Sequence, residues 1–273
     1  MPELPEVQTV VNVIAPVLTG KTIQSVQRLA GTGTLFGGGT EAEMNAFIAG
    51  QTIREVTRRA KYIVWRLDHG MLLIHLRMTG RLVFARSPEE QENHFTAVFQ
   101  FTDGTELWFK DYRKFGRITF AVDPEHWDTH LGLEPLSTEF TPVRLAMALH
   151  AHHRQIKPLL LDQSVIAGLG NIYVDEALWE ARIHPQTRSD RVSRPATRRL
   201  HRAIQSILTA AVAEQGTTIV NFYFGEGQSG NFRQFLKVFD RAGEPCPRCT
   251  TALRKIKVAQ RGTHFCPKCQ RKR

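Results

Sequence analysis

The sequence predicts an α+β protein in which an N-terminal β-sandwich, flanked by helices, precedes a helical part that ends in a cysteine-rich β-hairpin. Three observations support this fold class. Short alternating segments rich in β-branched residues fill the first ~130 residues, helical periodicity continues from Thr141 to about Gln215, and all four cysteines lie within residues 246–269. With 273 residues the chain is long for a single core, so two domains are expected.

Two helices are expected in the N-terminal part. The first begins near Pro5, which suits a first helical turn, and continues while apolar residues recur at helical spacing. These apolar residues are Val7, Val10, Val11, Ile14 and Leu18. Pro2 then stands just before a helix N-terminus, where the positive end of the helix dipole disfavours an ammonium and suits a phosphate. A capping box, Thr40-Glu41-Ala42-Glu43, predicts a second helix that ends by Gly50.

The remaining N-terminal segments read as strands, because apolar and polar residues alternate along them and turn residues separate them. The expected strands are 22–29, 52–59, 62–67, 71–77, 81–84, 96–101, 106–109 and 117–121. Asp68-His69-Gly70 and Asp103-Gly104 supply hairpin-type turns. This number of strands at short spacing favours a two-layer sandwich.

Composition changes after the strands. Residues 131–140 are interpreted as a hinge, and Thr141-Pro142 opens a series of helices. A helix that starts at Ser193 is expected to end at Gly216, a C-cap glycine. Residues 217–231 are rich in glycine and polar residues and are interpreted as a loop.

The expected domain organisation follows from these elements. Residues 1–130 form the sandwich domain, and 131–140 the hinge. Residues 141–239 form a helical domain that includes the loop 217–231, and 240–273 form the cysteine-rich hairpin.

The charge of the chain points to a polyanionic partner. Lys and Arg number 36 against 26 acidic residues, a net charge of +10. Residues 240–273 alone hold ten basic and two acidic residues, a net +8, and the cysteines there favour a folded segment over a solvated tail. No stretch approaches the roughly 18 apolar residues of a membrane span. Glu3 and Glu6 argue against a signal peptide, so we expect a soluble intracellular protein.

The cysteines form two Cys-x2-Cys pairs separated by 16 residues, a length that suits a β-hairpin. The four residues are Cys246, Cys249, Cys266 and Cys269. Four thiolates make a closed tetrahedral site without an open catalytic position. The intracellular environment keeps such thiols reduced, so one structural Zn²⁺ is predicted rather than disulfides.

The intervening hairpin is basic, with Arg254, Lys255 and Lys257 on one arm. We expect Gln260-Arg261-Gly262-Thr263 at its bend, where Arg261 is placed to contact a phosphate. A merely solvated turn arginine is the alternative.

The N-terminus carries potential chemistry. If Met1 is removed, Pro2 becomes a terminal secondary amine, a better nucleophile near neutral pH than lysine because its pKa is about 8. Such a nitrogen can attack a sugar's anomeric carbon and form an iminium, with Glu3 as proton donor or acceptor. Pro2 after Met1 is often inert, and Glu6 can simply favour the start of its helix.

Lys61 joins two expected strands within the basic stretch Arg58-Arg59-Ala60. It is either a surface residue or a group that binds phosphate or donates a proton. Met78 and the turn Arg113-Lys114-Phe115-Gly116 combine an exposed arginine with apolar side chains. Such residues can fill the hole left by an extruded nucleotide, although Met78 alone is also a natural core residue.

Gly168-Leu169-Gly170-Asn171 is a glycine-rich turn that leads into a helix. Its backbone amides can hold a phosphate, and Asn171 can act as N-cap, as phosphate donor or as both.

Taken together, these motifs resemble the formamidopyrimidine-DNA glycosylase family, bacterial repair enzymes for oxidised purines, along the whole chain. The motifs are Pro2-Glu3-Leu4-Pro5-Glu6-Val7, Arg59-Ala60-Lys61-Tyr62, His75-Leu76-Arg77-Met78, Asp111-Tyr112-Arg113-Lys114-Phe115-Gly116, Gly168-Leu169-Gly170-Asn171-Ile172-Tyr173 and the cysteine hairpin with Gln260-Arg261. The resemblance implies a sandwich domain, a helix-two-turn-helix domain and a zinc finger that together clamp damaged double-stranded DNA.

The resemblance also implies roles. Pro2 is the Schiff-base nucleophile, Glu3 the acid that assists base loss, and Lys61 and Arg261 the proton donors of the strand-cleaving eliminations. Asn171 and Arg261 grip phosphates near the flipped nucleotide.

Further DNA contacts follow by motif match. They are His75, His94, Arg113 and His152, the last at a position where a relative carries lysine. Met78, Arg113 and Phe115 match the wedge that replaces the lost base.

Leu4 and the length of the 217–231 loop favour oxidised purines, 8-oxoguanine and formamidopyrimidines, over oxidised pyrimidines. The chain departs from the family at Gln8, at Phe239, where Tyr is common, and at Asp240, where Gly is usual. These departures affect affinity more than chemistry.

The resemblance implies a monomer in the bacterial cytoplasm, associated with the nucleoid. Two alternatives remain open: the same chemistry on oxidised pyrimidines, and a catalytically silent zinc-ribbon DNA-binding protein.

Overall fold

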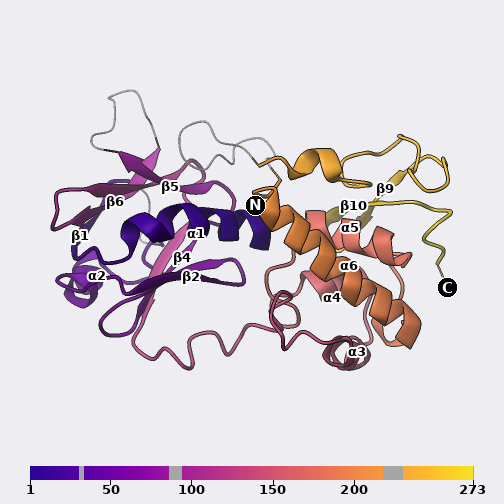
Figure 1. Ribbon diagram of the computed structural model, residues 1–273, viewed down its shortest axis with the longest axis horizontal. Helices are drawn as coiled ribbons and strands as arrows, with labels where there is room; N and C mark the ends of the chain where they lie inside the picture. The colour runs from indigo at the N-terminus through magenta and orange to yellow at the C-terminus, as the bar shows by residue number, and fades with distance from the viewer. Residues whose placement is uncertain (31–33, 86–93, 218–229, 273) are drawn as a thin grey trace. The chain divides into compact units, whose positions relative to one another are not determined.

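The computed structural model describes residues 1–30, 34–85, 94–217 and 230–272 (Figure 1). The chain forms two compact units. The first comprises Met1–Thr129 and Gln215–Asn231, and the second comprises His130–Glu214 and Phe232–Arg273. Most of the expected loop 217–231 lies outside the described residues. Its ends, Thr217 and Asn231, form an antiparallel bridge and group with the first unit rather than with the helical part.

The first unit contains two antiparallel four-stranded sheets. One has the order β1-β6-β7-β5 and the other β2-β3-β4-β8. The strands of the first sheet are β1 (Ile23–Arg28), β5 (Gly80–Ala85), β6 (Phe95–Phe101) and β7 (Glu106–Asp111). Those of the second are β2 (Glu55–Arg59), β3 (Tyr62–Arg66), β4 (Met71–His75) and β8 (Arg117–Ala121). All eight expected strands are present, and their register alternates side chains between the core and the outer face.

Both sheets share one hydrophobic core with helix α1 (Leu4–Leu18). Buried residues of both sheets, such as Ile63 and Phe99, belong to this core together with Val7 and Val11 of the helix. The helix begins at Leu4 after the N-cap Glu3, with Pro5 in its first turn, as the sequence predicts. Helix α2 (Glu41–Ile48) begins with the predicted capping box at Thr40. The expected sandwich flanked by helices is confirmed.

The second unit is helical. Its elements are α3 (Pro142–His150), α4 (Ile156–Leu161), α5 (Asn171–Ala181), the short 3₁₀ helices η1 (Ser189–Arg191) and η2 (Phe232–Phe235), and α6 (Arg194–Ala213). Helix α5 is buried along most of its length and packs against α6. Helix α6 ends earlier than predicted, because the left-handed residues that follow it are Gln215 and Gly216.

The second unit also contains the two-stranded hairpin of β9 (Arg254–Val258) and β10 (Arg261–Phe265). Val258 pairs with Arg261, so the turn consists of Ala259 and Gln260, with φ of 44° and 62°. The expected bend at 260–263 is therefore wrong by two residues, and Arg261 begins a strand. Non-glycine residues at positive φ store backbone strain, typically about 1–3 kcal/mol each.

Among the described residues, no helix combines the length and the apolar character needed to cross a bilayer.

Candidate functional site

The N-terminal residues are held by a reciprocal capping arrangement. The Glu3 side chain accepts a hydrogen bond from the backbone of Glu6, and Glu6 Oε2 accepts one from the Glu3 N–H at 2.9 Å. Glu6 Oε1 accepts a further bond from the Thr217 N–H at 2.7 Å. Both oxygens of Glu6 are thus engaged with backbone donors, and the interpretation that Glu6 favours the start of its helix is confirmed.

Pro2 is buried at the start of this arrangement, whereas Met1 is about half exposed. Burial lowers the pKa of the Met1 terminal amine below its usual value, and Lys61 and Arg113 add to this effect. Glu3 and Glu6 act in the opposite direction. Acidic and basic side chains therefore surround the point where the chain begins.

Lys61 lies in the turn between β2 and β3, and only 4% of it is exposed, so the alternative of an ordinary surface lysine is wrong. Ala60 beside it has φ 54°. Arg58 fixes this turn by donating to the Ala60 carbonyl at 2.9 Å and to Gln8 Oε1 of α1 at 2.9 Å. Gln8, a departure from the family pattern, thus connects the Lys61 turn with the N-terminal helix.

His75 ends β4 opposite Tyr62, and the two rings meet edge to face at 4.7 Å. Burial lowers the pKa of His75 to about 3, with smaller contributions from Arg77 and Lys61. His75 Nδ1 accepts a hydrogen bond from the Arg77 N–H at 3.0 Å. The neutral ring therefore carries its proton on Nε2, where it can donate to an anion.

A single carboxylate organises the turn that holds Arg113 and Phe115. Asp111, almost fully buried, accepts bonds from the Gly116 N–H at 2.6 Å, from the Arg113 N–H at 3.3 Å and from the Thr79 hydroxyl. Gly116 is required because a Cβ would lie 2.5 Å from the Phe109 ring.

The side chains of this turn stay in solvent. Phe115 is 47% exposed and Met78, the neighbour of Thr79, is 41% exposed. The Arg113 guanidinium lies over the Phe115 ring at 4.8 Å. Exposure on this scale excludes the core interpretation of Met78. The structure thus gathers the three expected wedge residues around Asp111.

His94 lies at the same edge of the sandwich. It is exposed, has φ 84°, and its carbonyl accepts a hydrogen bond from the Asp111 N–H at 2.9 Å. Its ring meets that of Tyr112 edge to face at 5.1 Å.

In the second unit, Asn171 is the first residue of α5, and Gly170 occupies the cap position. The N-cap interpretation of Asn171 is therefore wrong. Its amide Nδ2 donates instead to the Gly262 carbonyl of the hairpin at 3.0 Å. Asn171 thus lies directly against the strand that begins with Arg261, whose side chain is exposed.

Lys157 is completely buried, with 0% exposed. Its Nζ donates to Asp175 Oδ1 at 2.6 Å and to the Gly262 carbonyl at 3.1 Å. Asp175 Oδ2 accepts a bond from the His264 N–H at 2.8 Å. One buried ion pair therefore connects α4 and α5 with the zinc-finger hairpin.

The next residue of α5, Glu176, holds the segment that leads into the finger. Its carboxylate accepts bonds from the backbone N–H groups of Lys237, Val238 and Phe239 at 2.8–2.9 Å. The Phe239 ring packs edge to face on His264. Asp240 has φ 60°, which explains why glycine suits its position.

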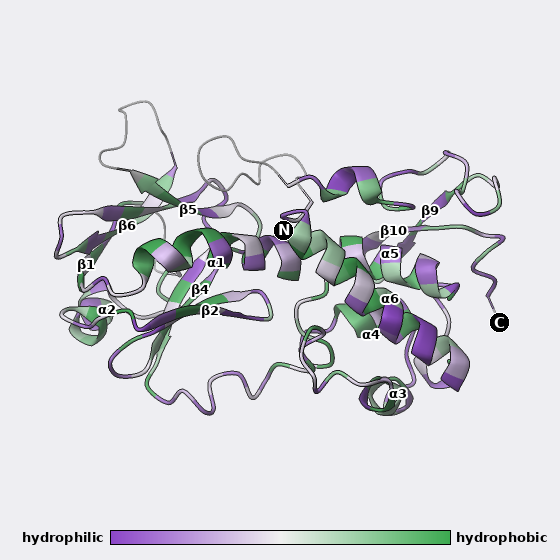
Figure 2. Ribbon diagram, in the orientation of Figure 1, coloured by the Kyte–Doolittle hydropathy of each residue, from purple (hydrophilic) through white to green (hydrophobic). Residues whose placement is uncertain are grey.

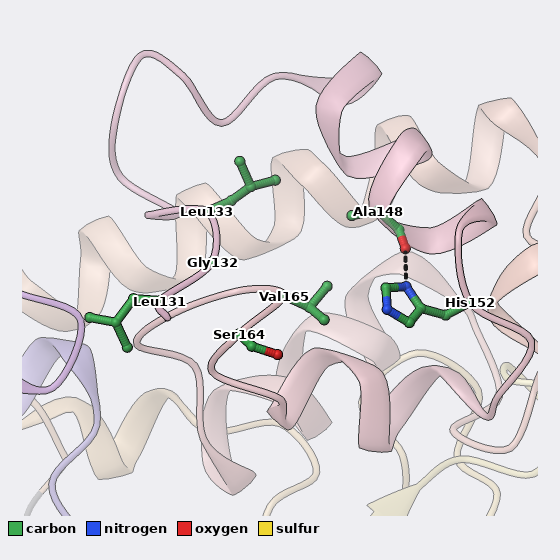
Figure 3. Close-up of a pocket in the computed structure, with 7 residues that line it drawn as sticks. All are labelled: Leu131, Gly132, Leu133, Ala148, His152, Ser164 and Val165. Atoms are coloured by element: carbon green, nitrogen blue, oxygen red, sulfur yellow. Dashed lines mark hydrogen bonds between the residues drawn. The ribbon is translucent and has the colours of Figure 1, made fainter. Parts of the chain in front are cut away.

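His152 lies apart from these contacts, on a shallow pocket beside the hinge (Figure 3). Its Nδ1 donates to the Ala148 carbonyl of α3 at 2.9 Å. Ser164 and Val165 form the opposite wall. In the described part of the chain, no hydrogen bond joins His152 to Asn171 or to the hairpin.

The four cysteine sulfur atoms all lie within 4.8 Å of one another. Tetrahedral zinc with Zn–S bonds of about 2.3 Å requires sulfur separations of roughly 3.8 Å, and the donor set consists of thiols only. The cysteines belong to a small hydrophobic cluster with Trp179, Val238 and Leu253. The residues therefore fit one structural Zn²⁺.

Three carboxylates that position the site were not predicted from the sequence: Asp111, Asp175 and Glu176. The last two interrupt an otherwise apolar stretch of α5, and two buried acids in such a helix signal that they bind something nearby. Asp111 carried no comparable signal, because a strand that ends in Asp before a turn is ordinary.

Comparisons with known proteins agree along the chain. Residues 1–118 match the family model described as formamidopyrimidine-DNA glycosylase N-terminal domain, and residues 131–222 match the H2TH domain of the same family. Residues 243–271 match a zinc finger found in FPG and IleRS. With the clustered thiols, this match confirms the predicted structural zinc.

Curated relatives match over the full length. The formamidopyrimidine-DNA glycosylase of Enterococcus faecalis is 42% identical, covering 99% of this chain and 97% of its own, and that of Chloroflexus aggregans is 44% identical, covering 99% and 98%.

Solved structures match equally well. A Lactococcus lactis FPG mutant in complex with Fapy-dG DNA has a TM-score of 0.89 at 35% identity, covering 99% of this chain and 100% of its own. MutM from Thermus thermophilus has a TM-score of 0.88 at 35% identity, covering 100% of both chains. The wild-type Lactococcus lactis protein, also at 0.88, is 36% identical, covers 99% and 100%, and was solved with DNA that contains an oxidised pyrimidine.

Proposed function

Because the chain belongs to the formamidopyrimidine-DNA glycosylase family over its whole length, and is thus a DNA glycosylase of base excision repair, we propose that it removes oxidised purines and then cleaves the abasic strand. The substrates are 8-oxoguanine and formamidopyrimidines in duplex DNA. The observation that carries this proposal is the buried Pro2 beside Glu3, next to a Met1 amine whose pKa is lowered by burial and, to a smaller extent, by Lys61 and Arg113.

Pro2 acts as the nucleophile after removal of Met1. The Met1 amine already has a lowered pKa because of burial, and Pro2 lies deeper than Met1. Only the neutral form of the Pro2 imino group can attack C1′.

Glu3 and Glu6 divide the acid–base work. Both oxygens of Glu6 hold backbone N–H groups, one of them on Thr217, so Glu6 is a positioning residue. Glu3 caps the helix next to Pro2 and is the carboxyl group that transfers protons.

The covalent steps follow. The Pro2 nitrogen bonds to C1′ while the glycosidic bond breaks, and the base leaves with the bonding electrons and takes a proton. The sugar ring opens to an iminium, which acidifies C2′–H. Loss of that proton expels the 3′ phosphate, and loss of the C4′ proton in a second elimination expels the 5′ phosphate, which leaves a one-nucleotide gap. Lys61 and Arg261 supply protons to the departing groups.

Other side chains hold the DNA. His75, neutral with a donor at Nε2, Asn171 and Arg261 bind phosphates, and His94 and His152 add contacts. Met78, Arg113 and Phe115 enter the duplex in place of the flipped nucleotide, which is consistent with their exposure. The enzyme acts as a monomer in the bacterial cytoplasm, on nucleoid DNA.

The second candidate function is the same chemistry on oxidised pyrimidines, which the pyrimidine complex of the Lactococcus lactis relative favours. Single-turnover excision from matched duplexes with 8-oxoguanine, thymine glycol or no lesion separates the candidates. We expect 8-oxoguanine to be excised fastest, with strand cleavage on both sides. Faster excision of thymine glycol contradicts the proposed specificity, and binding without cleavage contradicts the enzymatic proposal.

A further inference from the structure

Helix α6 carries a concentration of arginines that the contacts described so far do not use. Arg194, Arg198, Arg199 and Arg202 are all exposed, and we call them the arginine face. No Asp or Glu occurs between Asp190 and Glu214. Figure 2 shows the N-terminal half of α6 in strong purple, in contrast to its paler and greener C-terminal half.

The four arginines share one side of the helix. At 100° per residue they span an arc of about 140°, and the buried residues lie on the other side. The buried residues are Ala196, Thr197, Leu200, His201, Ala203 and Ile204. Within the described residues, none of the four guanidinium groups forms an ion pair with a carboxylate. The arginine face is therefore an uncompensated positive surface rather than one side of a salt-bridge network.

This arrangement costs helix stability. Arg194, Arg198 and Arg202 are neighbours at i, i+4 spacing, where like charges repel by a few tenths of a kcal/mol per pair. Arg194 also lies in the first turn of the helix, where the dipole disfavours positive charge. Local rules are commonly broken at functional surfaces, and arginine has the planar fork that matches phosphate oxygens.

The arginine face is separate from the phosphate contacts at Asn171 and Arg261. Arg199 Nε donates to the Ala181 carbonyl at 3.2 Å, at the C-terminal end of α5. Asn171 begins the same helix. Eleven residues at 1.5 Å per residue separate the two ends of α5 by about 15 Å.

We propose that the arginine face is a second DNA-binding surface, which holds the phosphate backbone of undamaged duplex without regard to sequence or lesion. From Arg194 to Arg202 the row extends about 12 Å, along which a duplex presents roughly seven phosphate charges. The inference goes beyond the proposed function and rests on it only in taking DNA as the polyanion. Its effect is to keep the enzyme on DNA between lesions.

The test compares two variants with the same loss of charge. The first changes Arg194, Arg198, Arg199 and Arg202 to Gln. The control changes Lys21, Arg54, Arg66 and Arg144 to Gln, four basic residues that pair with carboxylates. A third variant replaces the arginine face with lysines. Melting temperature and zinc content establish that each variant is folded.

Two quantities are measured: the salt dependence of Kd for a long undamaged duplex, and the single-turnover excision rate from a lesion duplex at saturating enzyme. We expect the Gln variant to lower the slope of log K against log salt by about 3.6, at about 0.9 for each of four lost phosphate contacts. Its affinity at low salt falls at least about tenfold, while its excision rate at saturation stays within about twofold of wild type. The control keeps its slope within about one, and the lysine variant retains most of the wild-type slope.

Several results overturn the proposal. An unchanged slope in the Gln variant shows that DNA does not contact this face. Equal losses of DNA affinity in the Gln variant and the control show that net charge alone causes the effect. Loss of the excision rate at saturation places the arginines at the lesion site. Unchanged DNA binding with lost binding of a polyglutamate peptide identifies an acidic protein as the partner. If no variant excises but the slopes still differ as expected, the proposed function fails and this inference stands.

Discussion

Two buried aspartates perform the same task in the two units by different means. Asp111 holds the turn of Arg113 and Phe115 through the neutral donors of Gly116 and Thr79, and no basic side chain of the described residues forms an ion pair with it. Asp175 holds the zinc-finger hairpin while its charge is paired with the fully buried Lys157.

This difference separates the reactive groups of the first unit from the anchoring groups of the second. Among the described residues of the first unit, no buried ion pair neutralises the anchoring carboxylate, and Glu3 and Lys61 both act on the charge of the terminal amine. In the second unit the anchoring charges are neutralised within the protein, so the hairpin that carries Arg261 is fixed without reference to the substrate. We therefore expect substitution of Glu3 in the first unit to change the rate, and substitutions at the buried ion pair or the zinc site of the second unit to change stability and affinity.

The largest effect is expected from removing zinc. Chelation, or Cys249→Ser, takes away the centre that organises the hairpin, because structural zinc contributes roughly 10–16 kcal/mol in isolated fingers. DNA affinity should fall more than about hundredfold, as measured by fluorescence anisotropy, while the first unit keeps its melting transition. Full DNA affinity in a zinc-free protein would contradict the claim that the second unit holds the DNA through its hairpin.

Glu3→Gln should act on rate alone. Loss of a general acid costs about 10²–10⁴ in rate, so single-turnover excision should fall by roughly that factor with little change in Kd. Strand cleavage at a preformed abasic site should fall much less, because the base has already left. Glu6→Gln is the matched control, with a smaller loss of rate. Equal losses for both variants would contradict the division of roles proposed for the two carboxylates.

Lys157→Met should destabilise the second unit by about 3–5 kcal/mol, because it leaves the Asp175 charge buried without a partner. The double variant Lys157→Met/Asp175→Leu should recover much of this loss in urea unfolding. If the double variant is no more stable than the single one, the Lys157–Asp175 pair contributes more than the neutralisation of its two charges.

Asp111→Asn should cost less, about 1.5–3 kcal/mol, the usual value of hydrogen bonds to a charged group. No buried cation loses its partner in this case. We expect lower affinity for DNA with an unchanged rate at saturation, since Arg113 and Phe115 lose their fixed turn. A loss as large as that of Lys157→Met would erase the contrast between the two aspartates.

The smallest effect, counted per pH unit, concerns the protonation of His75. The pKa of His75 is about 3 in the folded protein and about 6.5 in the unfolded chain, so both states are neutral above pH 6.5. Between pH 6.5 and 3 only the unfolded state gains a proton, and stability falls by up to about 1.4 kcal/mol per pH unit. The stability difference between wild type and His75→Gln, measured by urea unfolding, should shrink on acidification. A constant difference would contradict the low pKa.

Much of the fold was predictable because the local sequence patterns favour the same elements that the tertiary packing requires. Strands such as β7 alternate with the period of a half-buried sheet, and Thr40 and Pro5 mark the starts of helices. The hairpin bend was misplaced because Gly262 looked like the turn residue. Positive φ falls instead on Ala259 and Gln260, and Gly262 is a strand residue whose carbonyl binds α4 and α5.

Of the site, the exposed or chemically distinctive residues were predictable and the supporting ones were not. Cysteine spacing identified the metal site, and the basic turn at Arg113 stood out by composition. Lys157 before Pro158 gave no hint of burial, because its partner Asp175 is 18 residues away and only tertiary structure brings them together. The N-cap role predicted for Asn171 was wrong for the same reason, because its side chain bonds to a residue 91 positions later instead of to its own helix.

The most direct test of the central claim is borohydride trapping on a duplex with 8-oxoguanine, combined with intact mass and peptide mapping of the cross-linked protein. We predict that only chains that begin at Pro2 form the cross-link, that the attachment maps to Pro2, and that Pro2→Gly retains part of it through a primary amine. A fully active preparation that still carries Met1, or a cross-link that maps to Lys61, would contradict the account.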